Sequence, residues 1–189
     1  MEAFHELKVN CPYEILEIRD IKISNKPNEH GHLYLKVLVD ENVNFKYAIE
    51  ASTDDKICIY EETENQEKNI IFNGTIQNIK TSNVNRLYYM EIEALTSSFS
   101  LDIQEKSRSF QDTGMSYDNL INTILTDYKI YSFTQCMDRS RSIERPLFQY
   151  KETDYEFLKR VASYLGLQLI CDTINPDNVF HFGTPESKY

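Results

Sequence analysis

Hydrophobic and polar residues alternate along most of the first half of the chain. Residues 13–24 show this alternation first, and residues 33–39 repeat it with four aliphatic side chains on one face. A period of two residues is typical of a strand with one buried face. Further strands of the same kind are expected at residues 45–49, 57–59, 70–79 and 86–95. Up to about Phe99 the chain is therefore expected to be all-β.

Polar and turn-forming residues separate these expected strands. Residues 25–31 and 53–55 are rich in Asn, Pro, Gly, Thr or Asp, which favour turns. Residues 61–68 are expected to form an acidic loop, and residues 81–85 a polar turn. Strands of this length with no helix between them predict a small sandwich or barrel. We favour the barrel, although periodicity alone does not separate the two.

The pattern changes in the second half of the chain. Residues 101–110 are expected to be an extended connector, and residues 117–128 a helix with apolar residues at three- and four-residue steps. Ser116 is a suitable N-cap for this helix. A strand is then expected at residues 130–135, and an irregular polar segment at residues 136–144.

A second helix, over about residues 153–165, is the clearest element in the sequence. Thr153 and Glu156 form a capping box, in which each side chain bonds a backbone N–H that the first helical turn leaves unpaired. Gly166 supplies the left-handed residue expected just after a helix. Two short strands follow, at residues 167–171 and 179–182. The second region is therefore expected to be α+β, with two helices against a small sheet.

Together the two regions predict a mainly β protein with an α+β part. Residues 1–100 are expected to form a small β-barrel domain, and residues 101–189 an α/β domain with two helices on a small sheet. The composition agrees with a chain folded throughout, because 41% of its 189 residues are hydrophobic and only 5 are Gly and 5 are Pro.

Charge and hydropathy exclude two classes of partner. The net charge is −10, whereas nucleic-acid phosphates require a basic face, so no specific nucleic-acid binding is expected. No apolar run approaches the roughly 20 residues of a membrane helix, and the first ten residues do not form a signal peptide. We therefore expect a protein that is made in the cytoplasm and does not insert into a membrane.

Cysteine and histidine give no convincing metal or cofactor site. The four cysteines form no CxxC pair and are expected to be free thiols: Cys11, Cys58, Cys136 and Cys171. His30 and His32 lie close together in a turn and could contact a metal, but a solvated hairpin tip is the favoured interpretation. His181 alternates with two Phe residues and is expected to be a paired strand residue rather than a base.

No catalytic motif is evident either. A glycosidase needs two carboxylates that face each other across a cleft, whereas adjacent pairs such as Glu61-Glu62 point to opposite faces of a strand. With 30 acidic residues, the sequence does not single out a pair. Three arginines close together could pair with acidic side chains of a neighbouring subunit, although a solvated loop is favoured: Arg139, Arg141 and Arg145.

Residues 148–160 read Phe-Gln-Tyr-Lys-Glu-Thr-Asp-Tyr-Glu-Phe-Leu-Lys-Arg. This run resembles the "QY-x-E-(S/T)-D-x-x-F" strand-to-helix segment of the VgrG and phage late-control protein D hub family. In that family the helix ends in Gly before a hydrophobic strand, and Gly166 occupies that place here. Three further runs are similar to family segments and occur in the same order: residues 71–76, 101–112 and 181–183.

The resemblance implies both a fold and a role. Family members open with a β-barrel, continue into an α/β domain, and assemble as trimers that form a hollow hub between tail tube and piercing spike. It implies a structural, non-enzymatic baseplate hub subunit of a phage tail, tailocin or type VI-like machine. The expected partners are further copies in a homotrimer, and tail tube, spike and baseplate proteins. The expected location is a virion or injection particle, after synthesis in a bacterial cytoplasm. Neither the second barrel nor the spike domain of the family is expected within these 189 residues.

A second class of function stays open. Cell-wall hydrolases and glycan-binding modules often accompany injection machines, and the 13 Tyr and 10 Phe residues would suit glycan contacts. No carboxylate or metal set in the sequence supports this alternative over the structural one.

Overall fold

The computed structural model describes residues 6–41, 52, 54–62, 67–128, 132–136 and 138–184. The chain divides into two compact units, and each takes in a short segment from the other half of the sequence. Unit 1 consists of Met1–Asn25, Gly31–Ser97 and Thr173–Pro176. Unit 2 consists of Lys26–His30, Ser98–Asp172 and Asp177–Tyr189.

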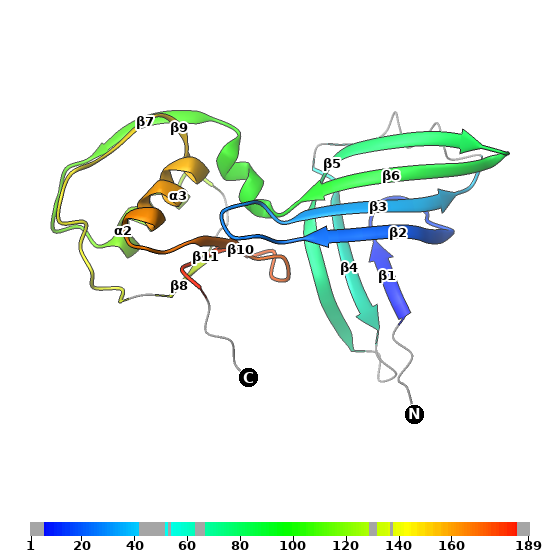
Figure 1. Cartoon of the computed structure of the whole chain (residues 1–189), viewed down its shortest axis with the longest axis horizontal. Coiled ribbons are helices and arrows are strands. Elements are labelled where there is room, and N and C mark those ends of the chain that lie inside the picture. The colour runs from blue at the N-terminus through cyan, green and yellow to red at the C-terminus, as the bar shows by residue number, and fades with distance from the viewer. Residues whose placement is uncertain are drawn as a thin grey trace. The chain divides into compact units, whose positions relative to one another are not determined.

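Unit 1 is built on a six-stranded antiparallel sheet that curls into a half barrel (Figure 1). The order across the sheet is β1-β4-β5-β6-β3-β2. The strands are β1 (Glu6–Asn10), β2 (Glu17–Ser24), β3 (His32–Val39), β4 (Lys56–Glu62), β5 (Lys68–Val84) and β6 (Leu87–Leu95). The expected mainly β fold is therefore confirmed, while the strand predicted at residues 45–49 lies outside the described residues.

Alternation along the strands buries one face of this sheet, as the sequence predicted. The aliphatic side chains of β3 and β4 on that face are nearly inaccessible to solvent: Leu33, Leu35, Val37, Val39, Ile57 and Ile59. Phe72 of β5 and Met90 and Ile92 of β6 are fully buried in the same core. Burial of these side chains is the main driving force for folding of the unit.

The polar turn predicted at residues 81–85 is wrong. Residues 81–83 belong to β5 and pair with residues 88–90 of β6. The chain reverses over Asn85 and Arg86, whose φ angles of 54° and 63° fit a two-residue type I′ turn. The end of this hairpin is exposed, so its strands need no apolar alternation and look like a loop in the sequence. The acidic loop predicted at residues 61–68 is wrong at its ends, because Glu61 and Glu62 belong to β4 and Lys68 begins β5; residues 63–66 lie outside the described residues.

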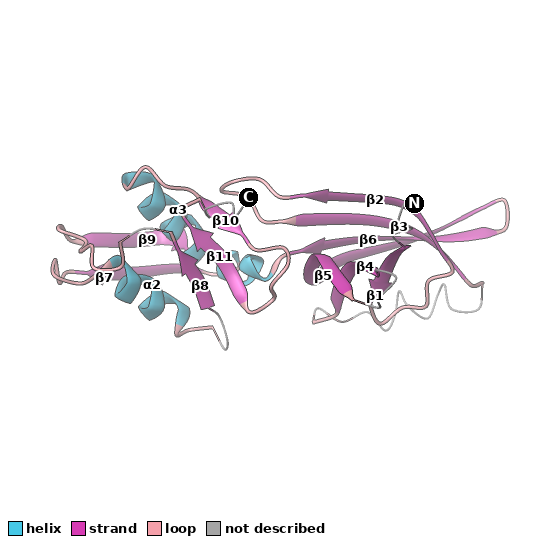
Figure 2. Ribbon diagram, turned by 90° about the horizontal axis from the view of Figure 1, so that it is seen from below, coloured by secondary structure: helices cyan, strands magenta, loops and turns pink. Residues whose placement is uncertain are grey.

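Among its described residues, unit 2 combines two α-helices and a 3₁₀ helix with two small sheets (Figure 2). Its elements are η1 (Ser97–Asp102, a 3₁₀ helix that begins at the last residue of unit 1), β7 (Glu105–Phe110), α2 (Tyr117–Leu125), β8 (Ser132–Gln135), β9 (Leu147–Thr153), α3 (Asp154–Tyr164), β10 (Leu169–Cys171) and β11 (Asn178–Phe182). One sheet has the order β10-β11-β8, and the other pairs β7 with β9 in antiparallel register. Within β10-β11-β8, β10 is antiparallel and β8 parallel to β11.

The apolar faces of both helices pack in one core with this sheet, which confirms the predicted arrangement. Buried side chains of α2, α3 and the three-stranded sheet meet there, among them Leu120, Ile121, Ile124, Phe157, Leu158, Val161, Leu169, Phe180 and Phe182. Helix α2 ends at Leu125, three residues earlier than predicted.

The predicted caps of both helices are confirmed. Ser116 accepts a hydrogen bond from the backbone N–H of Asn119 at 3.1 Å. Thr153 and Glu156 form the complete capping box of α3. Gly166 has a φ of 68°, and its N–H and that of the next residue return to carbonyls of the last helical turn, as in a Schellman motif.

The prediction that residues 101–110 form an extended connector is wrong. Its first residues form the end of η1, and Glu105–Phe110 is β7, a full partner of β9. The inward-facing residues at the start of β7 are Lys106 and Arg108, so the strand lacks the apolar alternation that identifies a half-buried strand.

Gly74 in β5 provides a test of this packing, and it lies within a run that resembles the hub family. A Cβ atom at Gly74 would lie 2.5 Å from the backbone oxygen of Leu95 and 2.7 Å from Cε1 of Phe72. Leu95 is fixed by pairing with Thr75, and Phe72 is fully buried, so neither atom moves cheaply. We expect Gly74→Ala to lower the free energy of unfolding by about 1–3 kcal/mol in urea titrations.

Gly114→Ala is the matched control. The same methyl group would there meet only Oδ1 of Asp112, at 3.3 Å, in an exposed turn. We expect this variant to change the free energy of unfolding by less than about 0.5 kcal/mol. Equal losses in the two variants would contradict the close approach at Gly74.

Candidate functional site

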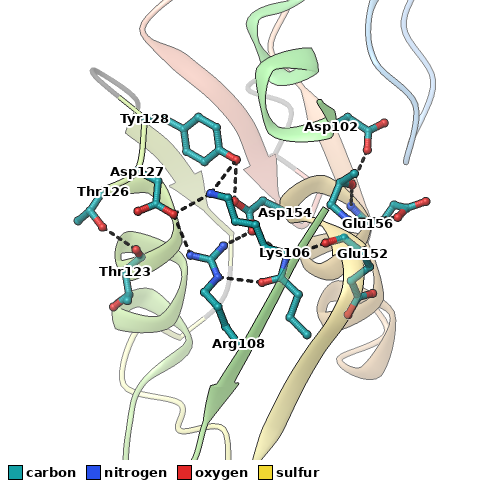
Figure 3. Close-up of polar contacts among 12 residues, drawn as sticks. Asp102, Lys106, Arg108, Thr123, Thr126, Asp127, Tyr128, Glu152, Asp154 and Glu156 are labelled. Atoms are coloured by element: carbon teal, nitrogen blue, oxygen red, sulfur yellow. Dashed lines mark hydrogen bonds and ion pairs between the residues drawn. The ribbon is translucent and has the colours of Figure 1, made fainter. Parts of the chain in front are cut away.

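The described residues contain no group of three or more His, Cys, Asp or Glu side chains that could hold a metal ion. Among the same residues, no helix is long and apolar enough to cross a membrane. Polar side chains do gather at one place in unit 2, around the carboxylate of Asp154 (Figure 3). This cluster is the candidate site.

Asp154 is the first residue of α3, and its side chain is fully buried. Oδ2 lies 2.9 Å from Nζ of Lys106 and accepts a hydrogen bond of 2.6 Å from the hydroxyl of Tyr128. Oδ1 accepts a hydrogen bond of 2.8 Å from Nε2 of Gln149 and also binds the guanidinium of Arg108. The carboxylate therefore has two cationic and two neutral donors, which a buried charge requires.

A second carboxylate completes the cluster. Oδ2 of Asp127 lies 2.7 Å from Nζ of Lys106 and 3.1 Å from Nη1 of Arg108. The two cations thus lie between a buried carboxylate and a half-exposed one, and the four charges balance. Nε of Arg108 also donates to Oε1 of Gln149 at 3.0 Å, so both ends of the Gln149 amide are used.

Four segments must come together to form this cluster, which we call the Asp154 network. β7 supplies Lys106 and Arg108, and β9 supplies Gln149, which is the direct register partner of Arg108. The two residues after the C-cap of α2 supply Asp127 and Tyr128, and α3 supplies Asp154. The network therefore ties the two-stranded sheet to an end of each helix.

Burial and the contacts of the network shift the pKa values of Asp154, Tyr128 and Lys106. Burial alone would raise the pKa of Asp154, but the donors Tyr128, Lys106, Gln149 and Arg108 outweigh it and hold the pKa below its ordinary value. Burial and the bond to Asp154 raise the pKa of Tyr128 to about 12. The pKa of Lys106 is raised by its two carboxylate partners, although burial opposes this. A general acid or base needs a pKa near the working pH, so the network is suited to structure rather than catalysis.

The rest of the segment that resembles the hub family has similar internal roles. The hydroxyl of Thr153 donates to Oδ1 of Asp102. Arg160 of α3 donates to Glu152 and, at 2.6 Å, to the backbone oxygen of Phe148. Phe148 and Tyr150 differ, because their side chains lie on the opposite face of β9 and are 58% and 73% exposed.

The interpretation of His30 as part of a solvated hairpin tip is wrong. Its side chain is only 13% exposed and lies within unit 2, whereas His32 lies in β3 of unit 1. Nδ1 of His30 is 2.9 Å from Oγ of Ser98, and Nε2 is 3.2 Å from Oδ2 of Asp102. Among the described residues, neither histidine belongs to a group of three or more side chains that could hold a metal ion.

These contacts follow the order of a Ser–His–Asp triad, but they do not form a usable one. The side chain of Ser98 is fully buried, so a substrate carbonyl has no access to its hydroxyl. We interpret Ser98, His30 and Asp102 as a hydrogen-bonded part of the interior of unit 2.

The remaining residues that the sequence singled out have ordinary environments. His181 pairs with Ile170 in the small sheet, as predicted, and its Nε2 lies 3.3 Å from Oδ2 of Asp172. The four cysteines are free thiols, as predicted. Arg139, Arg141 and Arg145 are exposed, so their pairing with a neighbouring subunit stays a prediction. Sequence reasoning missed the Asp154 network, whose one visible signal is the Lys-x-Arg alternation at residues 106–108.

Comparison with known proteins gives matches at the level of structure. No family model matches the chain, and no curated protein sequence does. A 43 kDa tail protein of prophage MuSo2 from Shewanella oneidensis superposes with a TM-score of 0.69 at 14% identity, covering 94% of this chain and 53% of that one. A tail protein from Neisseria meningitidis MC58 gives a TM-score of 0.66 at 10% identity, with coverages of 94% and 49%.

A third solved structure is an Escherichia coli component of the type VI secretion system, described as similar to the bacteriophage T4 tail proteins gp27 and gp5. Its TM-score is 0.58 at 13% identity, and the match covers 92% of this chain and 48% of that one. The chain thus spans about half the length of the structures it matches. The resemblance is confirmed as a shared fold, that of phage tail proteins and of a type VI secretion system component.

The Asp154 network yields a direct stability test. Asp154→Asn keeps the shape of the side chain but removes its negative charge. Lys106 and Arg108 then lose the buried carboxylate with which they form ion pairs. Breaking a buried ion pair from one side costs about 3–5 kcal/mol. We expect a loss of that size in the free energy of unfolding, measured by urea titration with far-UV circular dichroism.

Asp127→Asn serves as the control for this substitution. It removes a carboxylate that contacts the same two cations, but the Asp127 side chain is 48% exposed. Exposed ion pairs contribute about 0–1 kcal/mol, and we expect a loss in that range. An equal loss of less than about 1 kcal/mol in the free energy of unfolding of both variants would show that the buried carboxylate of Asp154 does not hold the network together.

Proposed function

We propose that this protein is a structural, non-catalytic subunit of the central hub of a contractile injection machine, such as a phage tail, a tailocin or a type VI-like system. In this proposal residues 1–100 form the barrel domain of the hub and residues 101–189 its α/β domain. Three copies form a ring that joins the tail tube to the spike and contacts baseplate proteins. The protein is made in a bacterial cytoplasm and acts in the assembled particle.

The observation that carries the proposal is the continuity of the structural match. One prophage tail protein covers 94% of the chain at a TM-score of 0.69, so the match spans both units rather than one common domain. A half barrel or a small α/β unit alone occurs in many proteins of unrelated function. A half barrel followed by a small α/β unit in one chain is a rarer combination than either unit alone, so a match to both is more informative about function.

The chemistry of the described residues supports a structural role as well. The charged groups of the Asp154 network neutralise one another, and the Ser98 hydroxyl is buried. By contrast, Phe148 and Tyr150 expose large aromatic surfaces beside the network. Exposed aromatic residues are enriched in protein–protein interfaces, so this face of β9 suits contact with another subunit.

Particle composition tests the proposal. Tail or injection particles purified from the source bacterium should contain the protein in a fixed ratio, at three copies per particle by quantitative mass spectrometry against the other tail proteins. Absence from intact particles would exclude the hub role, and a copy number that is not a multiple of three would exclude the trimeric ring.

Incubation with purified peptidoglycan separates the hub role from the cell-wall hydrolase alternative. We expect no soluble fragments to be released, because cations pair with both carboxylates of the Asp154 network and the Ser98 hydroxyl is buried. Fragment release that survives removal of contaminating enzymes would overturn the non-catalytic part of the proposal. Pull-down on peptidoglycan without release would instead favour the glycan-binding alternative.

A further inference from the structure

The loop that joins β2 to β3, residues Lys26–His30, belongs to unit 2 and is anchored there at two points. The first anchor is Asn28. Its backbone N–H donates to the oxygen of Leu169 at 2.7 Å, and its side-chain Oδ1 accepts from the N–H of Leu169 at 3.0 Å. The loop thus covers the free edge of β10 with a pair of bonds like those of a neighbouring strand.

The second anchor is His30, which is held by bonds at both ring nitrogens. A carboxylate can only accept, so Nε2 carries the hydrogen that is donated to Oδ2 of Asp102 at 3.2 Å. Nδ1 then accepts from the hydroxyl of Ser98 at 2.9 Å. The ring also packs against that of Tyr155, with centroids 4.0 Å apart. The neutral imidazole ring can make all of these contacts at once.

A proton added at Nδ1 would have an unfavourable environment. The new Nδ1–H of His30 would point at the hydroxyl hydrogen of Ser98. The hydroxyl would have to rotate so that its oxygen accepts a hydrogen bond from the ring instead of donating one. The side chain is largely buried, and the ammonium of Lys159 faces it from α3. Asp102 favours the charged ring, but this carboxylate also accepts the hydroxyl of Thr153.

The other groups that surround the ring do not reverse this balance. From η1, Ser98 and Phe99 are uncharged, and from α3 the phenol of Tyr155 stays neutral because burial raises its pKa strongly. Within the loop, Glu29 lies 3.5 Å from Nζ of Lys26, so its charge is already paired. Burial is the largest influence on His30 and lowers its pKa below the ordinary value, against the opposing effect of Asp102.

We propose that the loop Lys26–His30 is a pH-operated latch, docked on η1, α3 and β10 while His30 is neutral and released when Nδ1 takes up a proton from solvent.

The sign of the effect follows from linkage between protonation and docking. The released loop has the ordinary histidine pKa of about 6.5, and the docked loop has a lower one. Docking is therefore most favourable above about pH 6.5 and weakens as the pH falls toward the lowered pKa. In that window the ratio of released to docked loop rises by up to about tenfold per pH unit, and below it the ratio stays constant.

Nuclear magnetic resonance on the full chain tests the latch. The amide of Leu169 donates to Asn28 across the docked interface, so its hydrogen-exchange protection reports docking. We expect this protection, corrected for intrinsic exchange, to fall on going from about pH 7.5 to about pH 5. The amide of Leu120 in α2 bonds to Ser116 within its own helix and should keep its protection.

His30→Gln and His181→Gln form a matched pair of variants. Gln at position 30 can still bond Ser98 and Asp102 but does not titrate, so the fall in Leu169 protection should disappear. His181 lies on β11 beside Asp172, and its substitution should leave the fall in place.

The latch is overturned if Leu169 protection is the same at both pH values in the unsubstituted protein, or if His30→Gln shows the same fall. Loss of protection at Leu120 together with Leu169 would indicate global unfolding and would also overturn it. If His30→Gln does not fold, the ring-proton titration of His30 in the unsubstituted protein decides. A pKa at or above about 6.5 would exclude a docked state that favours the neutral ring.

Discussion

The fold of unit 2 depends on the contacts that keep one buried carboxylate, that of Asp154, charged although solvent does not reach it. Asp154 is fully buried, and such a charge persists only where cations and hydrogen-bond donors surround it. Lys106 and Arg108 of β7 and Gln149 of β9 supply most of that surrounding. The network can form only when both strands and both helices are in place, so it links the folding of segments that lie far apart in the sequence.

This dependence changes what the hub-like segment of the sequence means. The network accounts for the presence of Gln149 and Asp154 in this segment. Thr153 is accounted for by its role as the N-cap of α3. Each of these residues therefore serves the fold of the chain itself. The side chains of Phe148 and Tyr150 lie on the other, exposed face of β9 and take no part in the network.

The features that the sequence predicted well are those with local causes. The capping box at Thr153, the stop at Gly166 and the buried face of β3 depend on residues a few positions apart. The failures have non-local causes. β7 was missed because its inward residues are cations whose buried partner lies more than forty positions away, in α3. The end of β5 was missed because no core lies beneath it, and the setting of His30 because its loop packs against distant segments.

Asp154 and His30 show two answers to one constraint, the cost of placing an ionisable group away from water. Asp154 keeps its charge because two cations and two neutral donors compensate it, and the same contacts move its pKa away from neutrality. His30 has one carboxylate partner, shared with Thr153, and a cation nearby, so it stays neutral instead. Burial lowers the pKa of His30, and Asp102 opposes that effect. Unit 2 therefore combines a network that holds its charges across the neutral range with a loop anchor that responds to pH.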